Sequence, residues 1–213
     1  FNAAGLTRAK LVETDTSIFV GVMSVEFREA LWHSNAYAMT GTGHCFAAGR
    51  LSYVLGLHGA CSMIDTACSA GLVATSFARA ALVLSESEVA SVMAVNLILS
   101  PDGAHTPFAI AGMTSATGKC HTFDKHTDGY ARSEACGASV LQTRVSEVEE
   151  LVMLEGSAVR CDGKSASLTA PNGQAQRRYI ADHQRRGPPL SALQYGHARQ
   201  WQLTTDEQQR SRS

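Results

Sequence analysis

The sequence predicts an α/β fold, in which helices cover a sheet whose strands are largely buried. The stretch Val89–Leu99 is an almost unbroken apolar run, which is typical of a strand buried on both faces. Short apolar runs also alternate along the chain with longer stretches rich in Ala and Leu. This alternation favours strands and helices that follow one another in a layered domain.

The first elements can be assigned in chain order from their side chains. The run Ser17–Val22 is rich in β-branched residues and contains a glycine near its end, which predicts a buried strand. Cys45–Leu55 combines Ala with large apolar residues and predicts a helix. Ala60–Asp65 predicts a second strand, and Ser69–Leu84 predicts the helix that follows it.

The rest of the chain has a less regular pattern. Residues 104–125 contain a proline and two glycines as breakers, so we expect a loop with a short helix. Gly137–Gln142 and Leu151–Ala158 predict two further strands. From about Gln174, paired arginines and several glutamines leave little apolar periodicity, which predicts a solvated, disordered tail rather than a nucleic-acid-binding one.

Composition limits the function classes. A chain of 213 residues with 45% hydrophobic content can bury one sizeable core. The net charge of −1 gives no field that would recruit nucleic acid or an anionic membrane. No apolar run approaches the roughly 20 residues of a membrane span. The sequence starts without Met and without a secretory signal, so we expect a fragment that begins inside a domain.

The six cysteines show no C-x-x-C pair and no regular spacing, so they predict reduced, mostly buried thiols of an intracellular protein. The predicted location is cytoplasmic, with a plastid as the open alternative. Cys120 and His121 are adjacent rather than spaced for a shared ion, and no metal site is predicted. The cysteines are Cys45, Cys61, Cys68, Cys120, Cys136 and Cys161.

Cys68 is the candidate nucleophile. It stands where a short apolar run ends in small residues and the predicted helix Ser69–Leu84 begins. The unpaired N–H groups and the positive end of a helix dipole favour the thiolate there. A thiolate is the species that attacks an acyl carbonyl. The alternative is a small buried cysteine that packs like Ala.

The stretch Asp65–Ser69, with the sequence Asp-Thr-Ala-Cys-Ser, resembles the nucleophile motif of β-ketoacyl synthases, the condensing domains of polyketide and fatty acid synthases. The last matching stretch, Leu168–Gly173, is most similar to the multidomain, type I polyketide synthases. The resemblance runs from the first residue to about Arg178. The other matches, in family order, are Gly21–Ser24, Gly49–Tyr53, Val95–Pro101, Thr122–Asp124, Asp128–Tyr130 and Gly156–Val159.

The resemblance implies a thiolase-like layered fold (α/β/α/β/α), here incomplete, in which helices cover and separate two five-stranded sheets. It also implies a division of the chain. Residues 1–178 would be the N-terminal and central part of a β-ketoacyl synthase domain. Residues 179–213 would be a divergent tail that is disordered or frame-shifted.

The activity that the resemblance implies is that of an acyltransferase, the decarboxylative Claisen condensation of a 3-oxoacyl-[acyl-carrier-protein] synthase. Cys68 would be the nucleophile, and its backbone N–H would be half of the oxyanion hole. No cofactor would be bound directly, because the acyl and malonyl thioesters are carried on the phosphopantetheine of an acyl carrier protein. The intact domain would be a homodimer that pairs through residues 60–65.

The chain departs from the family pattern near its end. His197 stands about where the first family histidine is expected, but the glycines and threonines around that histidine are missing. A reading-frame shift after about Gly187 would explain this, and His197 would then have no catalytic role. The family's lysine motif, second histidine and glycine-rich loop do not occur. The alternative function is therefore a non-catalytic thiolase-fold fragment that only packs or dimerises.

Smaller departures concern glycines and the remaining polar residues. By the resemblance, Met93, Ala94, Ser133 and Ala135 stand where the family has glycines, so we expect local backbone strain of roughly 1 kcal/mol or more at each Ser and Ala. The other histidines match no family catalytic position. The carboxylates of Asp124, Asp128 and Glu134 are expected to form structural hydrogen bonds rather than to act as an acid and a base. The histidines are His33, His44, His58, His105, His121, His126 and His183.

Overall fold

A computed structural model of the chain describes residues 1–23, 26, 36–99, 105–143, 153–154, 156–167 and 170–186. The chain divides into two compact units. The first consists of Phe1–Cys120 and Asp128–Val148, and the second of His121–Thr127 and Glu149–Ser213. The first unit contains the sheet and the predicted nucleophile.

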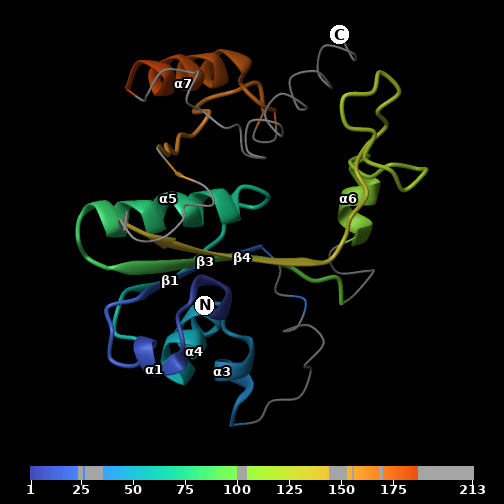
Figure 1. Ribbon diagram of the computed structural model, residues 1–213. Helices are drawn as coiled ribbons and strands as arrows, with labels where there is room; N and C mark the ends of the chain where they lie inside the picture. Colours follow the sequence, from blue (N-terminus) through green and yellow to red (C-terminus); the bar gives the residue numbers. More distant parts are fainter. Residues whose placement is uncertain are drawn as a thin grey trace. The chain divides into compact units, whose positions relative to one another are not determined.

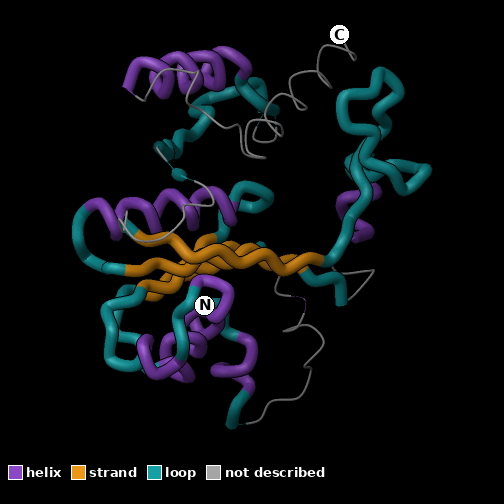
Figure 2. Tube along the Cα trace, viewed as in Figure 1, coloured by secondary structure: helices purple, strands orange, loops and turns teal. Residues whose placement is uncertain are grey.

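One four-stranded sheet forms the centre of the first unit (Figure 2). Its strands are β1 (Ser17–Val22), β2 (Cys61–Ile64), β3 (Val89–Asn96) and β4 (Ala135–Gln142), in the order β2-β1-β3-β4. The first three strands are parallel, and β4 runs antiparallel to β3. Consequently the carboxyl ends of β1, β2 and β3 and the start of β4 lie along one edge of the sheet.

Helices cover both faces of this sheet. Helix α5 lies on one face, and the short helices α1, α3 and α4 lie on the other (Figure 1). Among the residues with described positions, no helix is long and apolar enough to cross a membrane. The helical segments of this unit are a 3₁₀ turn at Asn2–Ala4, α1 (Arg8–Leu11), α3 (Ala38–Thr42), α4 (Cys45–Leu55), α5 (Ala70–Val83) and α6 (Thr106–Ile110).

The core consists of two apolar clusters, one on each face of β1. Phe19 belongs to the cluster that packs against α5, while Ile18 and Val20 belong to the cluster beside α4. Successive side chains of a strand point to opposite faces, so a run of apolar residues fills both clusters at once. The face that α5 turns to the sheet is mostly alanine, at positions 70, 74, 78 and 81, which lets the helix approach closely.

The predicted strands Ser17–Val22, Ala60–Asp65 and Gly137–Gln142 are confirmed within two residues at each end, as is the short helix between 104 and 125. The strand predicted at Leu151–Ala158 is wrong where it can be checked, because residues 153, 154 and 156–158 form no strand. An apolar run supplies strand propensity, but a strand also needs a partner ladder, which periodicity does not reveal.

The disordered tail predicted from Gln174 is wrong up to residue 186, because the second unit contains helix α7 (Gly173–Arg186). Asn172 caps the helix, since its Oδ1 accepts a hydrogen bond from the N–H of Ala175 at 3.2 Å. The Tyr179 hydroxyl donates to the carbonyl of Ala158 at 2.8 Å and ties α7 to the preceding loop. Arg and Gln are good helix formers, so a polar segment with a cap can be helical without apolar periodicity. Residues 187–213 lie outside the described part.

The left-handed conformation that would strain Ala94, Ser133 and Ala135 does not occur, because none of these residues has a positive φ angle. Ala94 instead packs opposite a helix glycine. A β-carbon placed on Gly71 would lie 2.8 Å from the Ala94 β-carbon. The missing glycine of β3 is therefore offset by a glycine in α5.

Gly21 is the residue of β1 that brings α5 closest to the sheet. A β-carbon at Gly21 would lie 2.5 Å from the carbonyl carbon of Ala70 and 2.6 Å from the N atom of Gly71. Both neighbours are backbone atoms in the first turn of α5, so they cannot rotate away. Gly21 therefore sets the height of the helix N-terminus above the sheet.

We predict that Gly21→Ala lowers the free energy of unfolding by about 1–3 kcal/mol, as expected for overpacking against backbone. The matched control is Gly49→Ala in α4, where a β-carbon would meet nothing within 4 Å. This control should gain up to about 1 kcal/mol from helix propensity. Urea unfolding followed by circular dichroism measures both, and equal effects of the two substitutions would contradict the packing argument.

Candidate active site

The predicted nucleophile lies in a tight turn, Asp65–Ser69, which joins β2 to α5 and is called the elbow below. The Oδ1 atom of Asp65 accepts a hydrogen bond from the N–H of Ala67 at 3.0 Å. The Ser69 hydroxyl donates to the Thr66 carbonyl oxygen at 2.8 Å. These local bonds close the turn with the side chains of the motif itself.

Ala67 stores strain in the elbow, because its φ angle of 52° lies in the left-handed region. Such a conformation costs a non-glycine residue roughly 1–2 kcal/mol. It reverses the chain between β2 and α5, and the next residue is Cys68. The sequence predicted the turn but not which residue would carry the unusual angle.

Cys68 is exposed and precedes Ser69, the residue at the N-cap position of α5. The structural hydrogen bonds of the elbow and of the helix start use the N–H groups of Ala67, Ser69 and Ala70. The thiol thus stands at the N-terminus of a 14-residue helix, where the partial positive charge of the dipole favours negative charge. The alternative of a buried cysteine packed like Ala is wrong.

All six cysteines are exposed, free thiols, so the expectation that most would be buried is wrong. Cys61 and Cys136 show why, since they lie on β2 and β4, the two outer strands of the described sheet. A cysteine in a strand sequence is buried only if neighbouring elements cover it. Exposure alone therefore does not single out Cys68.

Tyr130, which the sequence had marked only as part of a motif, lies within electrostatic reach of Cys68. Burial raises the pKa of the Tyr130 phenol, and the charge of the nearby Cys68 raises this pKa further, whereas Arg132 lowers it. Gly129 precedes it with a φ angle of 145°. A β-carbon there would lie 2.5 Å from the N atom of Ser115, so the motif needs glycine at this position.

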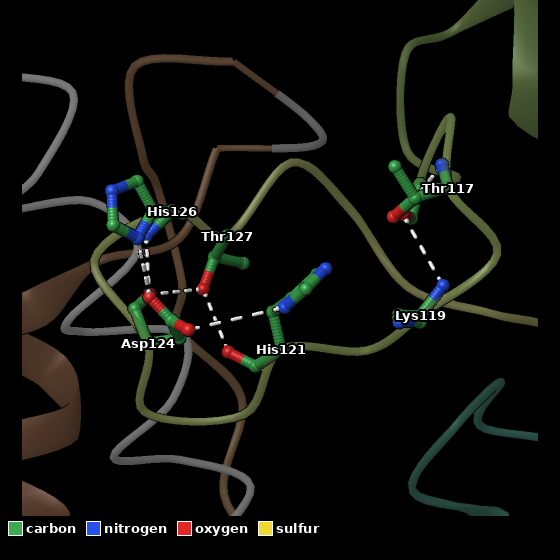
Figure 3. A network of polar contacts seen from close by, with 7 residues as sticks. Thr117, Lys119, His121, Asp124, His126 and Thr127 are labelled. Atoms are coloured by element: carbon green, nitrogen blue, oxygen red, sulfur yellow. Dashed lines mark hydrogen bonds and ion pairs between the residues drawn. The ribbon is translucent and has the colours of Figure 1, made fainter.

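A hydrogen-bonded loop at His121–Thr127 contains the family match Thr122–Asp124 and belongs to the second unit (Figure 3). The Oδ1 atom of Asp124 accepts from the backbone N–H of His126 at 2.9 Å and lies 3.0 Å from its ring Nδ1 atom. The Thr127 hydroxyl donates to the carbonyl of His121 at 2.9 Å. Asp124 bonds the loop in this way, as expected for a scaffold residue.

The structure places no further sequence candidate beside Cys68 among the residues that it describes. His33 and His197 lie outside the described residues, and His183 lies in α7. Within the described ranges, no group of three His, Cys, Asp or Glu side chains is placed to hold a metal ion. An open cavity of about 480 Å³ occurs in the second unit, at the start of α7, and Cys68 is not among its lining residues.

Comparisons with known proteins place the chain in a family. Residues 1–146 match the family model of the β-ketoacyl synthase N-terminal domain. The chain is 40% identical over 187 residues to a phenolphthiocerol/phthiocerol polyketide synthase of Mycobacterium tuberculosis (strain CDC 1551 / Oshkosh). The match covers 83% of this chain and 10% of that protein. The chain therefore belongs to the β-ketoacyl synthase family, whose matched relatives are polyketide synthases.

Solved structures agree with the thiolase-like fold predicted from the sequence. The ketosynthase from module 6 of the bacillaene synthase of Bacillus subtilis 168 superposes with a TM-score of 0.73 at 34% identity. A ketosynthase domain for oxazolomycin from Streptomyces albus JA3453 gives a TM-score of 0.58 at 32% identity. The first comparison covers 81% of this chain and 30% of the ketosynthase, and the second covers 66% and 25%. The fold is thus a part of the layered ketosynthase architecture.

We predict that His126→Ala raises the pKa of Asp124 but leaves it below the ordinary value of 3.8. The backbone N–H of His126, the largest cause of the lowered pKa, remains, while the side-chain hydrogen bond is lost. Because the folded pKa is depressed, Asp124 stabilises the loop above pH 3.8, and this contribution disappears as the pH falls through the folded pKa.

Carbon-13 NMR titration of the Asp124 carboxyl measures this shift, with His58→Ala as the control outside the loop. An Asp124 pKa that is unchanged in the His126 variant would contradict the assigned cause.

Proposed function

We propose that this chain supplies the acyl-accepting cysteine of a polyketide synthase ketosynthase. The observation that carries the proposal is Cys68, exposed on the elbow at the N-terminus of α5, in a chain of the β-ketoacyl synthase family. The substrates would be acyl and malonyl thioesters on the phosphopantetheine arm of an acyl carrier protein. That carrier protein is the proposed partner, and no cofactor would bind to the chain directly.

In the first step, the Cys68 thiolate attacks the carbonyl carbon of the carrier-bound acyl thioester. Negative charge moves to the carbonyl oxygen, where the N–H of Cys68 is the proposed donor. The N–H groups of Ala67, Ser69 and Ala70 already bond within the elbow or to its helix. Collapse of this intermediate expels the carrier thiolate, which takes up the proton that Cys68 lost, and leaves the acyl group on sulfur.

In the second step, the carbon–carbon bond to the carboxylate of malonyl breaks, and CO₂ leaves. The electron pair remains on the α-carbon, which attacks the acyl-Cys68 carbonyl and releases the cysteine thiolate. This decarboxylative Claisen condensation needs donors for the enolate oxygen, normally two histidines in the family. His197 is the candidate that the sequence offers for one of them.

The division of the chain at residue 178 remains part of the proposal. Residues 1–178 would belong to the ketosynthase domain, and residues 179–213 would be divergent. Six free thiols fit a reducing compartment, the cytoplasm or a plastid.

A second candidate function is packing or dimerisation without catalysis, and β2 is the observation that favours it. β2 is an outer strand of the described sheet, and Cys61 and Ser62 at its start are exposed. An open strand edge presents N–H and C=O groups to another strand. The two functions are compatible in the intact domain, where a homodimer through residues 60–65 is expected.

We predict that butyryl-pantetheine transfers its butyryl group to Cys68, since the elbow presents an exposed thiol at a helix N-terminus. Intact-mass and peptide mass spectrometry detect the hydroxylamine-labile adduct. Cys68→Ser should abolish it, whereas the matched control Cys45→Ser, at another exposed cysteine, should leave it unchanged. An equal adduct in both variants, or none on the unmodified chain, would contradict the assignment.

We also predict that the isolated chain forms dimers or larger soluble aggregates, because strand edges and apolar side chains such as Leu72 and Phe77 on α5 are exposed. Size-exclusion chromatography with light scattering measures the mass. Because the proposed dimer pairs through residues 60–65, Cys61→Lys on β2 should reduce dimerisation, whereas Cys136→Lys on β4, outside that pairing, should not. A cooperatively melting monomer of the unmodified chain would exclude this prediction.

A further inference from the structure

The chain buries an ion pair that the proposed chemistry does not use. The side chains of Glu26 and Arg132 are 4% and 6% exposed, and their Oε1 and Nη2 atoms lie 3.8 Å apart. The guanidinium carbon of Arg132 lies 5.1 Å from the centre of the Phe108 ring. The Oε2 atom of Glu26 accepts a hydrogen bond from the N–H of Leu99 at 2.6 Å. Removing two charges from water is costly, so such a pair points to a positional role.

The topology places this pair at the same edge of the sheet as the elbow. Glu26 follows β1, Leu99 follows β3, and Arg132 precedes β4, whose first residue pairs with the last of β3. The elbow follows β2, and the helix that it starts packs on Gly21 of β1 and Ala94 of β3. The carboxyl ends of parallel strands are the general location of sites in α/β sheets.

The loop Asp128–Arg132 has two kinds of anchor. Its backbone bonds the loop that follows α6. The N–H of Tyr130 donates to the Met113 carbonyl at 3.1 Å, and the N–H of Ala131 donates to the Cys120 sulfur at 3.3 Å. These contacts tie one loop to another. Arg132 connects the loop to Glu26 and Phe108, so it fixes both loops relative to the strand ends.

We propose that Arg132 is a positioning residue for Cys68, which holds the loop through Glu26 and Phe108 so that Tyr130 forms a wall beside the thiol. Tyr130 is 37% exposed, so solvent reaches part of its side chain and the titration of its phenol can be followed. The proposal rests on the proposed function only in naming Cys68 as the acyl acceptor. The placement of Tyr130 is tested without any acyl transfer.

The test uses the full chain with Arg132→Met and two readouts. Carbon-13 NMR of labelled tyrosine, assigned with Tyr130→Phe, measures the pKa of the Tyr130 phenol. Loss of a nearby positive charge alone would raise this pKa further, since Arg132 lowers it. Release of the loop into water would instead lower it toward the ordinary value of 10.0. We expect the decrease, together with faster alkylation of Cys68 by N-ethylmaleimide.

Three further variants complete the test. Arg132→Lys keeps the charge and should restore both readouts, and Arg8→Met removes an exposed arginine that bonds only the Val54 carbonyl and should change neither. Circular dichroism at each pH monitors folding. If Arg132→Met unfolds, Phe108→Leu removes the ring under the guanidinium but leaves the ion pair, and it should shift both readouts in the same direction.

A higher Tyr130 pKa with an unchanged alkylation rate, in Arg132→Met or in Phe108→Leu, would overturn the proposal. If the shifts occur but Cys68 takes no acyl group, the proposed function fails and the positioning role stands.

Discussion

The structure of the first unit depends on the close contact between the first turn of α5 and strand β1. The backbone of Ala70 and Gly71 lies so close to Gly21 that no side chain would fit at position 21. The alanine face of α5 continues this contact along the sheet. Interiors are packed at near-crystal density, so a helix that is lowered onto a strand at one end is fixed along its length. The position of Cys68 above the sheet follows from this contact, because it lies two residues before Ala70.

The elbow adds its own constraints to that contact. Asp65 and Ser69 close the turn by local hydrogen bonds, and Ala67 takes a left-handed conformation that its side chain disfavours. Strain of this kind persists only where the surroundings determine the conformation, and it is common at functional sites. The packing of the first turn of α5 on Gly21 of β1 and Ala94 of β3 supplies such surroundings next to the elbow.

Local patterns predicted most of the first unit, because its strands and helices carry their apolar residues at the expected periods. Local patterns did not predict the features that depend on other parts of the fold, such as strand pairing and burial. The apolar run Leu151–Ala158 lacks a ladder in its described part, and α7 forms because Asn172 caps a polar segment with good helix propensity. Cys61 and Cys136 are exposed because each lies on an outer strand of the described sheet.

The candidate site was predictable in part. The small residues between a predicted strand and a predicted helix were enough to predict Cys68 as the nucleophile. The proposed roles of Tyr130 and Arg132 depend instead on a fold that brings residues far apart in the chain to one sheet edge. The Asp-Gly-Tyr sequence at Asp128–Tyr130 was the available signal, since its glycine is needed for a close backbone approach. Sequence spacing alone did not connect that motif with the elbow.

The central claim is that the elbow makes Cys68 a nucleophile, and the reactivity of the six cysteines tests it most directly. All six cysteines are exposed, so each can be alkylated in the folded chain and their rates can be compared. Iodoacetamide labelling at neutral pH, followed by mass-spectrometric mapping, gives the six rates in one sample. The account predicts that Cys68 reacts first, because the N-terminus of α5 stabilises negative charge on its sulfur. Equal labelling of all six, or faster labelling of Cys120, would contradict it.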